Sequence, residues 1–477
     1  RPCATGLAGF RISVASVASV CAPENVTVEA LNSNGDRVTD YSGLVNLSTS
    51  SGDGNWGIGS GEGGLTPSPD DDNDGAARYQ FSGSDEGRVQ LTLSNRLADQ
   101  LTVSVADNDA NVLNTSDPVQ FRENVIRVQT QDPLEQDIVA GRDHGIELQV
   151  IGRDDSGECG LIEAYDQTVP LKAWLTRGSA DPGGAAPAVS GSEALPDDPP
   201  PENNLDVSFD QGEANLELET SDVGQYSLNM LDDSSGLVEN ANGDPLPVGG
   251  QGPEWTVRPF GFDVAVVAPE NPGASEPSGD AFNAAGRPFD VSIRAVQWQS
   301  GDDTNDDGQP DGHGTLGGTE RSDLSGNETA GTFGVSDPLV ALSSTLVAPA
   351  ANAVDPGLAG TVQTDTFSNG ESTVEVRFEE VGSIDIQALL EGSYLGRSVT
   401  VQGRSGYVGR FHPEAFTAQV ADDGAFTPEC NGFVYSGQPH GYDPDQRPEL
   451  TIVPRGWSDS GQGQVLENYQ GDWQKLT

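Results

Sequence analysis

The stretch TSDVGQYSLNM, residues 220–230, decides the fold, because a turn that holds an acid and a glycine leads directly into alternating apolar residues. The run before it, EANLELE at residues 213–219, alternates in the same way. Apolar residues at every second position are typical of a strand with one face buried. The stretch therefore predicts two half-buried strands joined by a short turn.

The same frame occurs three times, and each copy has a glycine, two apolar residues, an acid, a second glycine and two further apolar residues. The copies are Gly75, Tyr79, Phe81, Asp85, Gly87, Val89 and Leu91; Gly212, Leu216, Leu218, Asp222, Gly224, Tyr226 and Leu228; and Gly370, Val374, Val376, Glu380, Gly382, Ile384 and Ile386. Three copies in one frame indicate repeated units. The D-x-G-x-Y corner is also close to the one before strand F of immunoglobulin-like sandwiches. We therefore expect Val89, Tyr226 and Ile384 at equivalent buried positions of three sandwiches.

The predicted fold class is all-β, with tandem immunoglobulin-like β-sandwich domains in series that end in a partial further β domain. A chain of 477 residues allows roughly three or four domains, and its 60 glycines and 31 prolines suit many turns. We expect sandwiches at residues 1–122, 123–258 and 259–407, the second with a Pro/Asp-rich insertion. Residues 408–477 read as the start of a further β domain, so we expect the parent protein to continue. The sequence shows no signal peptide and no initiator Met, since its one Met is Met230, so we also expect the parent protein to begin earlier.

The formal net charge of −52 argues against a nucleic-acid partner, which would require clustered Lys and Arg. Such an excess of acids resembles proteins from salt-loving organisms, where salt screens the self-repulsion; a calcium-loaded surface is the alternative. Most of the carboxylates are expected to be solvated. No apolar run approaches the roughly 20 residues that cross a bilayer, so no transmembrane segment is predicted.

Four cysteines suggest disulfides and an oxidising compartment, because their spacing fits no zinc site. Cys3 and Cys21 flank the strand-like segment FRISVAS and are predicted to form a pair. Cys159 and Cys430 are left as a weaker second pair.

The acidic segment DTNDDGQPD, residues 303–311, matches the first nine positions of an EF-hand-like calcium loop. Its predicted oxygen ligands are Asp303, Asn305, Asp307, Gln309 (through its backbone carbonyl) and Asp311. Gly314 replaces the usual glutamate at position twelve, so a further carboxylate such as Glu320 would be needed. The related segment DDDNDG, residues 70–75, has Arg78 at position nine and is interpreted mainly as a solvated turn.

No catalytic constellation stands out, so no enzymatic activity is predicted. The four histidines are scattered, and His440 in GQPHGYD reads as part of a turn. Trp56 and Trp457 lie beside turns, where an exposed indole could stack on a sugar ring, although packing in the core is the commoner use.

Several phrases resemble MshQ-type proteins, which belong to the biogenesis set of the mannose-sensitive haemagglutinin (MSHA) type IV pilus. The most distinctive are GYVGRFHPEAFTAQV, CNGFVYSGQPHGY and NYQGDWQKLT, and weaker ones are FRISVASVASVCAPENVTVEALNSNG, GLVNLSTSSGDGNWG and DGAARYQFSGSDEGRVQLTL. The resemblance implies a large, exported, β-rich protein of the cell surface and implies no reaction.

The sequence thus predicts a non-enzymatic extracellular stalk, adhesin or assembly component of an MSHA-like pilus or cell surface, exported through the periplasm. Its partners would be pilus or cell-surface proteins. The alternatives are a surface-displayed glycan-binding module, which needs a groove lined by exposed aromatic rings, and a carbohydrate-active hydrolase, which needs two carboxylates in a deep cleft.

Overall fold

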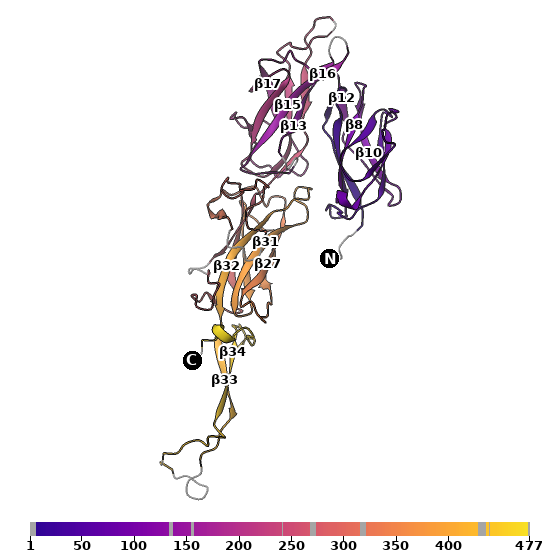
Figure 1. Ribbon diagram of the computed structural model, residues 1–477. Coiled ribbons are helices and arrows are strands. Elements are labelled where there is room, and N and C mark those ends of the chain that lie inside the picture. Colours follow the sequence, from indigo (N-terminus) through magenta and orange to yellow (C-terminus); the bar gives the residue numbers. More distant parts are fainter. Residues whose placement is uncertain are drawn as a thin grey trace.

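The computed structural model describes residues 6–132, 137–153, 157–240, 242–267, 273–314, 321–427, 436–437 and 439–475. Strands dominate these residues, and their helices are short 3₁₀ turns. No helix in this part of the chain is long and apolar enough to span a membrane. Three hydrophobic cores follow one another along the sequence, and Figure 1 shows the corresponding β-sandwiches.

The first sandwich packs the sheet β1-β3-β8-β5 against the sheet β11-β10-β4-β7-β6, with β2-β12-β9 at one end. Its apolar core includes the buried rings of Tyr79, Phe81 and Phe121. The elements are β1 (Gly9–Ser13), β2 (Val17–Ser19), β3 (Glu24–Leu31), β4 (Leu44–Thr49), β5 (Asn55–Ser60), β6 (Gly64–Thr66), β7 (Ala76–Gln80), η1 (Gly83–Asp85), β8 (Arg88–Ser94), β9 (Gln100–Leu101), β10 (Val103–Asp107), β11 (Val112–Thr115) and β12 (Val119–Arg122).

The second sandwich has one layer with β13, β15, β20 and β18 and another with β14, β23, β21, β17 and β19. Strand β22 pairs with both β13 and β21 and so connects the layers. The elements are β13 (Val125–Thr130), β14 (Asp137–Val139), β15 (Asp143–Arg153), β16 (Cys159–Leu161), β17 (Thr168–Arg177), β18 (Ala188–Val189), β19 (Leu205–Ser208), β20 (Glu213–Glu219), β21 (Gly224–Asp232), β22 (Val248–Gln251) and β23 (Trp255–Arg258).

The third sandwich packs the sheet β24-β26-β30-β28 against the sheet β25-β32-β31-β27-β29. Its core contains two sets of aromatic rings in edge contact, one with Phe262 and Phe333 and the other with Phe282 and Phe411. The elements are β24 (Gly261–Val267), β25 (Asn283–Ala284), β26 (Phe289–Val296), η2 (Leu324–Gly326), β27 (Leu339–Ala348), β28 (Leu358–Gly360), β29 (Gln363–Thr364), β30 (Glu371–Phe378), β31 (Gly382–Glu391) and β32 (Gln402–His412).

A two-stranded ribbon follows the third sandwich and extends away from it (Figure 1). It consists of β33 (Ala415–Asp422) and β34 (Glu449–Arg455), and η3 (Gly471–Trp473) follows near the end of the described chain. The chain then returns to the sandwich, because Leu466 and Trp473 bury their side chains with Val381 and Ala285. The described part of the C-terminal region is therefore a hairpin and a returning segment attached to the third sandwich.

The second and third sandwiches have the strand pairing of immunoglobulin-like domains. The first repeat strand, β20 or β30, pairs with the second long strand of its sandwich, β15 or β26. The chain then crosses to the other sheet. In the second sandwich β21 lies there between β17 and β23, and in the third β31 lies between β27 and β32. A short early strand also runs parallel to the last strand in both domains. The all-β fold with immunoglobulin-like domains in series is confirmed.

The first repeat copy covers the pair of strands one position earlier in its sandwich than the other two copies do. This corrects the predicted equivalence of Val89, Tyr226 and Ile384. Val89 on β8 lies opposite Val28 on β3, so β8 corresponds to β20 and β30 and not to β21 and β31. Tyr226 and Ile384 instead lie opposite residues of the last strands, Trp255 and Val408. In the first sandwich, the residue opposite the last strand is Leu101, which pairs with Val119. All of these residues are buried, so alternation alone could not identify the strand.

The second and third sandwiches follow each other along one axis, whereas the first sandwich lies beside the second (Figure 1). The first sandwich also reaches the near end of the third, because Arg397 contacts Ser13 and Glu29. All three sandwiches therefore share one junction.

Candidate functional site

The most distinctive sites in the described chain are the joints between its modules. At the joint between the second and third sandwiches, Asp222 follows β20 and precedes β21. Its carboxylate accepts hydrogen bonds from the backbone amide of Val223 (2.8 Å) and from the amide (3.1 Å) and hydroxyl of Thr332 in the third sandwich. Val223 itself is 1% exposed and belongs to the apolar core of the third sandwich. The turn of one sandwich thus inserts an acid and a valine into the next.

The same construction recurs at the far end of the third sandwich. Glu380, 4% exposed, accepts the amide of Val381 at 2.8 Å. It also accepts two amides of the returning C-terminal segment, from Glu467 (2.8 Å) and Asn468 (3.2 Å). Val381 packs with Leu466 and Trp473. An acid and the valine after it therefore join each of these sandwiches to the segment that follows it.

The corresponding acid of the first copy, Asp85, makes contacts only within its own sandwich among the bonds that the structure describes. It accepts bonds from Glu62, Tyr79 and Ser82. The residue after it is Glu86, not valine, and it lies in the left-handed region with a φ of 48°. The tripeptides DVG and EVG, as against DEG, are the sequence signal that separates the joints from an ordinary turn.

A buried arginine connects the first sandwich to the other two. Arg397, 6% exposed, lies 3.4 Å from Glu29 and 3.8 Å from Glu254, and it donates to the hydroxyl of Ser13 at 3.1 Å. Burial lowers the pKa of Arg397, and the two carboxylates oppose this shift. Glu29 also has Arg11 at 3.0 Å. Removal of the Arg397 charge would therefore leave the buried carboxylate of Glu29 without one of the opposite charges that compensate its burial.

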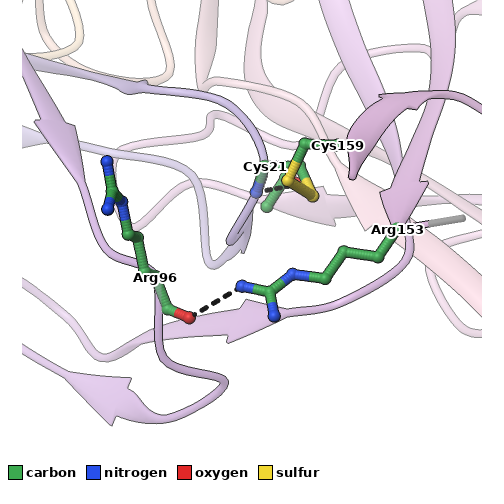
Figure 2. Close-up of a disulfide and its surroundings, with 5 residues drawn as sticks. Cys21, Arg96, Arg153 and Cys159 are labelled. Carbon is green, nitrogen blue, oxygen red and sulfur yellow. Dashed lines mark hydrogen bonds between the residues drawn. A yellow bond between two sulfur atoms is a disulfide. The ribbon is translucent and has the colours of Figure 1, made fainter. Parts of the chain in front are cut away.

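A disulfide between Cys21 and Cys159 connects the first and second sandwiches covalently (Figure 2). Cys21 lies just after β2, Cys159 begins β16, and their Cα atoms are 5.1 Å apart. Arg153 reaches across the same contact and donates to the backbone carbonyl of Arg96 at 3.1 Å. The docking of these two consecutive sandwiches therefore brings together two cysteines that are 138 residues apart in the sequence.

This disulfide corrects the predicted pairing of Cys3 with Cys21 and of Cys159 with Cys430. Cys21 and Cys159 are bonded to each other, while Cys3 and Cys430 lie outside the described residues. Sequence proximity favoured a local loop, but Cys21 lies at the face of its sandwich that meets β16.

The acidic loop 303–311 also lies at the joint between the second and third sandwiches. Arg258 of the second sandwich donates to the carbonyl of Gly308 at 3.0 Å, and Arg142 is 2.9 Å from the carboxylate of Asp306. Val139 and Phe260 pack nearby in a small apolar cluster with Val296 and Leu324. The loop therefore helps to hold the two sandwiches together.

The predicted ligands of this loop are held mainly by bonds inside it. Asp303 accepts the amides of Asp307 and Gly308 at 3.1 and 3.0 Å, and Asp311 accepts two bonds from Thr304. Asn305 donates to Asp307, and the side-chain amide of Gln309 donates to the carbonyl of Thr400. Asp303, Asp307 and Asp311 do not form the compact carboxylate group found elsewhere among the described residues. Calcium in this loop stays a prediction, and Glu320 lies outside the described residues.

The two tryptophans that were considered for sugar stacking differ in exposure. Trp56 is 3% exposed and donates its indole N–H to the carbonyl of Gly75 at 3.1 Å, so it belongs to the core of the first sandwich and offers no ring face to a sugar. This part of the prediction is wrong, because the side chain of Trp56 packs in the apolar core of the first sandwich. Trp457 is partly exposed, and its amide bonds to Ala285.

Two histidines are buried within hydrogen-bond networks. His144 bonds Asp132 through Nδ1 and the backbone of Val139 through Nε2. His313 accepts the amide of Arg404 at Nδ1 (3.0 Å), so its Nε2–H faces the carbonyl of Ser322 (3.1 Å). Burial lowers the pKa of His313 to about 4. These contacts suit structural roles, and His440 packs against Phe426 in the hairpin region.

A cavity of about 470 Å³ lies where the three sandwiches meet, lined by residues of each that include Arg11, Asp117, Arg177, Glu254 and Leu395. Burial raises the pKa of Glu254, whereas Arg397 and Arg11 oppose the shift. In the part of the chain that the structure describes, no aromatic side chain lines this cavity. The cavity therefore differs from an aromatic sugar-binding groove.

The strand pairing and the joints define a linked array of immunoglobulin-like sandwiches. Three consecutive stretches match one family: residues 107–243 match the first Ig-like domain of DUF6701, a domain of unknown function, and residues 258–377 and 380–477 match its second and third domains. The chain belongs to the DUF6701 family. The family boundary near residue 380 falls at the EVG joint, so β31 and β32 are grouped with the C-terminal segment.

Among solved structures, the chain is similar to the Escherichia coli adhesin FdeC at 13% identity, covering 83% of this chain and 96% of that one with a TM-score of 0.23. It is similar to the bacterial integrin-binding protein invasin at 11% identity, covering 90% and 64% with a TM-score of 0.21. For the D1–D4 fragment of ICAM-5, identity is 9%, coverage 95% and 97%, and the TM-score 0.26. None of the curated proteins compared with the chain matches it.

Proposed function

We propose that this protein is a non-enzymatic structural module of the bacterial cell surface, which acts as a stalk, adhesin or assembly component. The observation that supports this most is the construction of its joints. The joint between the second and third sandwiches combines the buried side chain of Val223 with hydrogen bonds to Asp222. The buried pair of Arg397 and Glu29 holds the first sandwich to the third, and a disulfide bonds the first to the second. Such joints keep a multi-domain chain in one arrangement, whereas domains joined by small polar contacts move relative to each other.

The covalent joint supports an extracellular location. Disulfides persist in secreted and surface proteins and are rare in the reducing cytosol, and the Cys21–Cys159 bond connects two folded domains. The charge of −52 suits salt-rich surroundings, where ions screen the repulsion between carboxylates. We propose export through the periplasm on this basis.

The proposed setting is an MSHA-like type IV pilus. The support for it is the sequence resemblance to MshQ-type proteins, and the DUF6701 match is compatible with it because that family has no assigned function. In this setting the partners are pilus or cell-surface proteins.

The location of the intact protein tests the proposal. Pili sheared from cells are purified and probed for this chain, with a strain that lacks the major pilin as control. Recovery with pili, lost in the pilin-deficient strain, is the expected result. Recovery only as a free chain in the medium contradicts the pilus setting, and recovery only in the cytosol contradicts the surface role itself.

The hydrolase alternative can be tested at the shared cavity, which contains the acidic residues Asp117 and Glu254. Glu254 lies 3.8 Å from Arg397, so its charge has a structural partner. We expect no turnover of a panel of chromogenic glycosides. Turnover that disappears in Glu254→Gln but persists in the surface variant Glu379→Gln would establish an enzyme instead.

A further inference from the structure

The loop DDDNDG, residues 70–75, gathers three carboxylates in the first sandwich. It lies between β6 and β7, and Asp70, Asp72 and Asp74 each place one oxygen within 4.8 Å of the others. Among the described residues, this is the group of acidic, histidine or cysteine side chains with the spacing of a metal site. Asp72 and Asp74 are exposed, whereas Asp70 is buried.

Asp70 provides an independent indication that this loop binds a ligand. The residue is only 8% exposed, and its Oδ2 accepts the backbone amide of Trp56 at 2.5 Å. Its Oδ1 is buried and has no hydrogen-bond partner among the described residues. A buried carboxylate oxygen that lacks a partner costs free energy, and neighbouring negative charges increase this cost. A cation between the three carboxylates would compensate both the unpartnered oxygen and the repulsion between the negative charges.

The neighbouring fold explains why Asp70 is held in place. Strand β5 is at the edge of its sheet, so the amide of Trp56 has the loop as its partner in place of another strand. The indole of Trp56 also donates to the carbonyl of Gly75. Gly75 has a φ of 69°, and a Cβ there would lie 2.1 Å from the hydroxyl oxygen of Thr49. Both ends of the loop are therefore fixed against a buried ring.

The spacing also suits calcium. Asp70, Asp72 and Asp74 occupy positions one, three and five of a D-x-D-x-D-G frame, and Gly75 occupies position six. Calcium prefers carboxylate, carbonyl and water oxygens, and it tolerates irregular coordination by six to eight of them. Arg78, which argued against a full EF-hand frame, is an exposed residue of β7.

We propose that Asp70, Asp72 and Asp74 form a Ca²⁺ site that fastens the β6–β7 loop to the edge strand β5. Asp70 supplies Oδ1 from the buried side, and the exposed pair supplies one oxygen each. Water completes the coordination. This inference is independent of the proposed cell-surface function.

The test uses the full chain, with calcium binding followed by calorimetry and with Tb³⁺ as a luminescent substitute that is excited through Trp56. The informative variants are Asp72→Asn and Asp74→Asn, because both side chains are exposed and their replacement leaves the core intact. Asp71→Asn is the matched control, since it removes the same charge from the same loop outside the carboxylate group. Asp307→Asn controls for the loop 303–311. All measurements are made in excess NaCl, which screens general attraction to an acidic surface.

The expected result is sensitised terbium emission and calcium binding that weaken at least tenfold in Asp72→Asn and in Asp74→Asn. Asp71→Asn and Asp307→Asn should change the affinity less than twofold. Calcium should also slow hydrogen exchange at the amides of Trp56 and Asn73. Equal weakening by Asp71→Asn and Asp72→Asn would show general electrostatic attraction and overturn the proposal. Loss of binding only in Asp307→Asn, or no binding to the intact chain, would overturn it as well.

Discussion

Replacing Glu380 with glutamine should release the C-terminal segment from the third sandwich. The carboxylate accepts one amide from its own turn and two from the returning segment, those of Glu467 and Asn468. Glutamine keeps one acceptor oxygen but turns an NH₂ group toward an amide that previously donated. One charge-assisted bond is therefore lost, and a buried donor is left without a partner.

The size of the effect follows from these contacts. A hydrogen bond to a charged group contributes about 1.5–3 kcal/mol, and an unsatisfied buried group costs about 1–3 kcal/mol. Because the segment also keeps its apolar contacts through Leu466 and Trp473, we expect about 3 kcal/mol less docking free energy. This corresponds to roughly a hundredfold rise in the population of the open state, at about 1.4 kcal/mol per factor of ten.

Hydrogen exchange of residues 464–475 measures that opening directly. Glu379→Gln is the matched control, because the neighbouring carboxylate is exposed and pairs with Arg377 on the surface. Exchange at the amides of Glu467 and Asn468 should accelerate about a hundredfold in Glu380→Gln and remain unchanged in Glu379→Gln. A change below about threefold in Glu380→Gln, or an equal change in both variants, would refute the coupling role of the corner acid.

Three further predictions concern a buried histidine of the third sandwich, the disulfide and the buried arginine of the shared junction. Burial holds the pKa of His313 at about 4, below its ordinary 6.5. The stability that this neutral ring contributes should therefore be complete above pH 6.5 and fall by about 3 kcal/mol as the pH drops to 4. Denaturant titration should show this loss relative to His313→Asn, and identical pH profiles of the two proteins would contradict it. Cys21 and Cys159 should resist thiol labelling before reduction, and modification of either in the unreduced protein would disprove their pairing. Arg397→Met should weaken docking of the first sandwich by about 3 kcal/mol, the low end for a broken buried pair, so small-angle scattering should show expansion after reduction of the disulfide; an unchanged radius of gyration would be inconsistent with a coupling role.

The sequence was sufficient for the fold class because alternation and turn glycines are local signals. Tyr226 and Ile384 lie where the D-x-G-x-Y and E-x-G-x-I frames place them, at the start of the strand that follows the corner. Val89 shows the limit, since a half-buried strand has the same pattern whichever strands it pairs with. Pairing partners depend on long-range contacts that a period of two does not encode.

The joints could not be predicted from local sequence patterns either, because they also depend on long-range contacts. Cys21 meets Cys159 across a separation of 138 residues, and only the docking of two sandwiches brings them together. The glycines beside Trp56 suggest an exposed ring, yet its side chain packs among apolar residues that are distant in the sequence, such as Leu91 and Phe121. In the loop 70–75, the frame was visible, but the burial of Asp70 came only from its contact with β5.

The chemistry of the joints suits a protein with so many carboxylates. The chain has 75 acidic residues and only 23 lysines and arginines, so ion pairs cannot secure every contact. Asp222 and Glu380 instead bind backbone amides, which need no basic side chain and are present in any segment. Salt screens exposed charge pairs strongly and buried contacts much less. Arginine pairs with a carboxylate where the carboxylate is itself buried, as in the pair of Arg397 and Glu29. A corner acid followed by a valine can thus join successive modules under salt conditions that would weaken a surface ion pair.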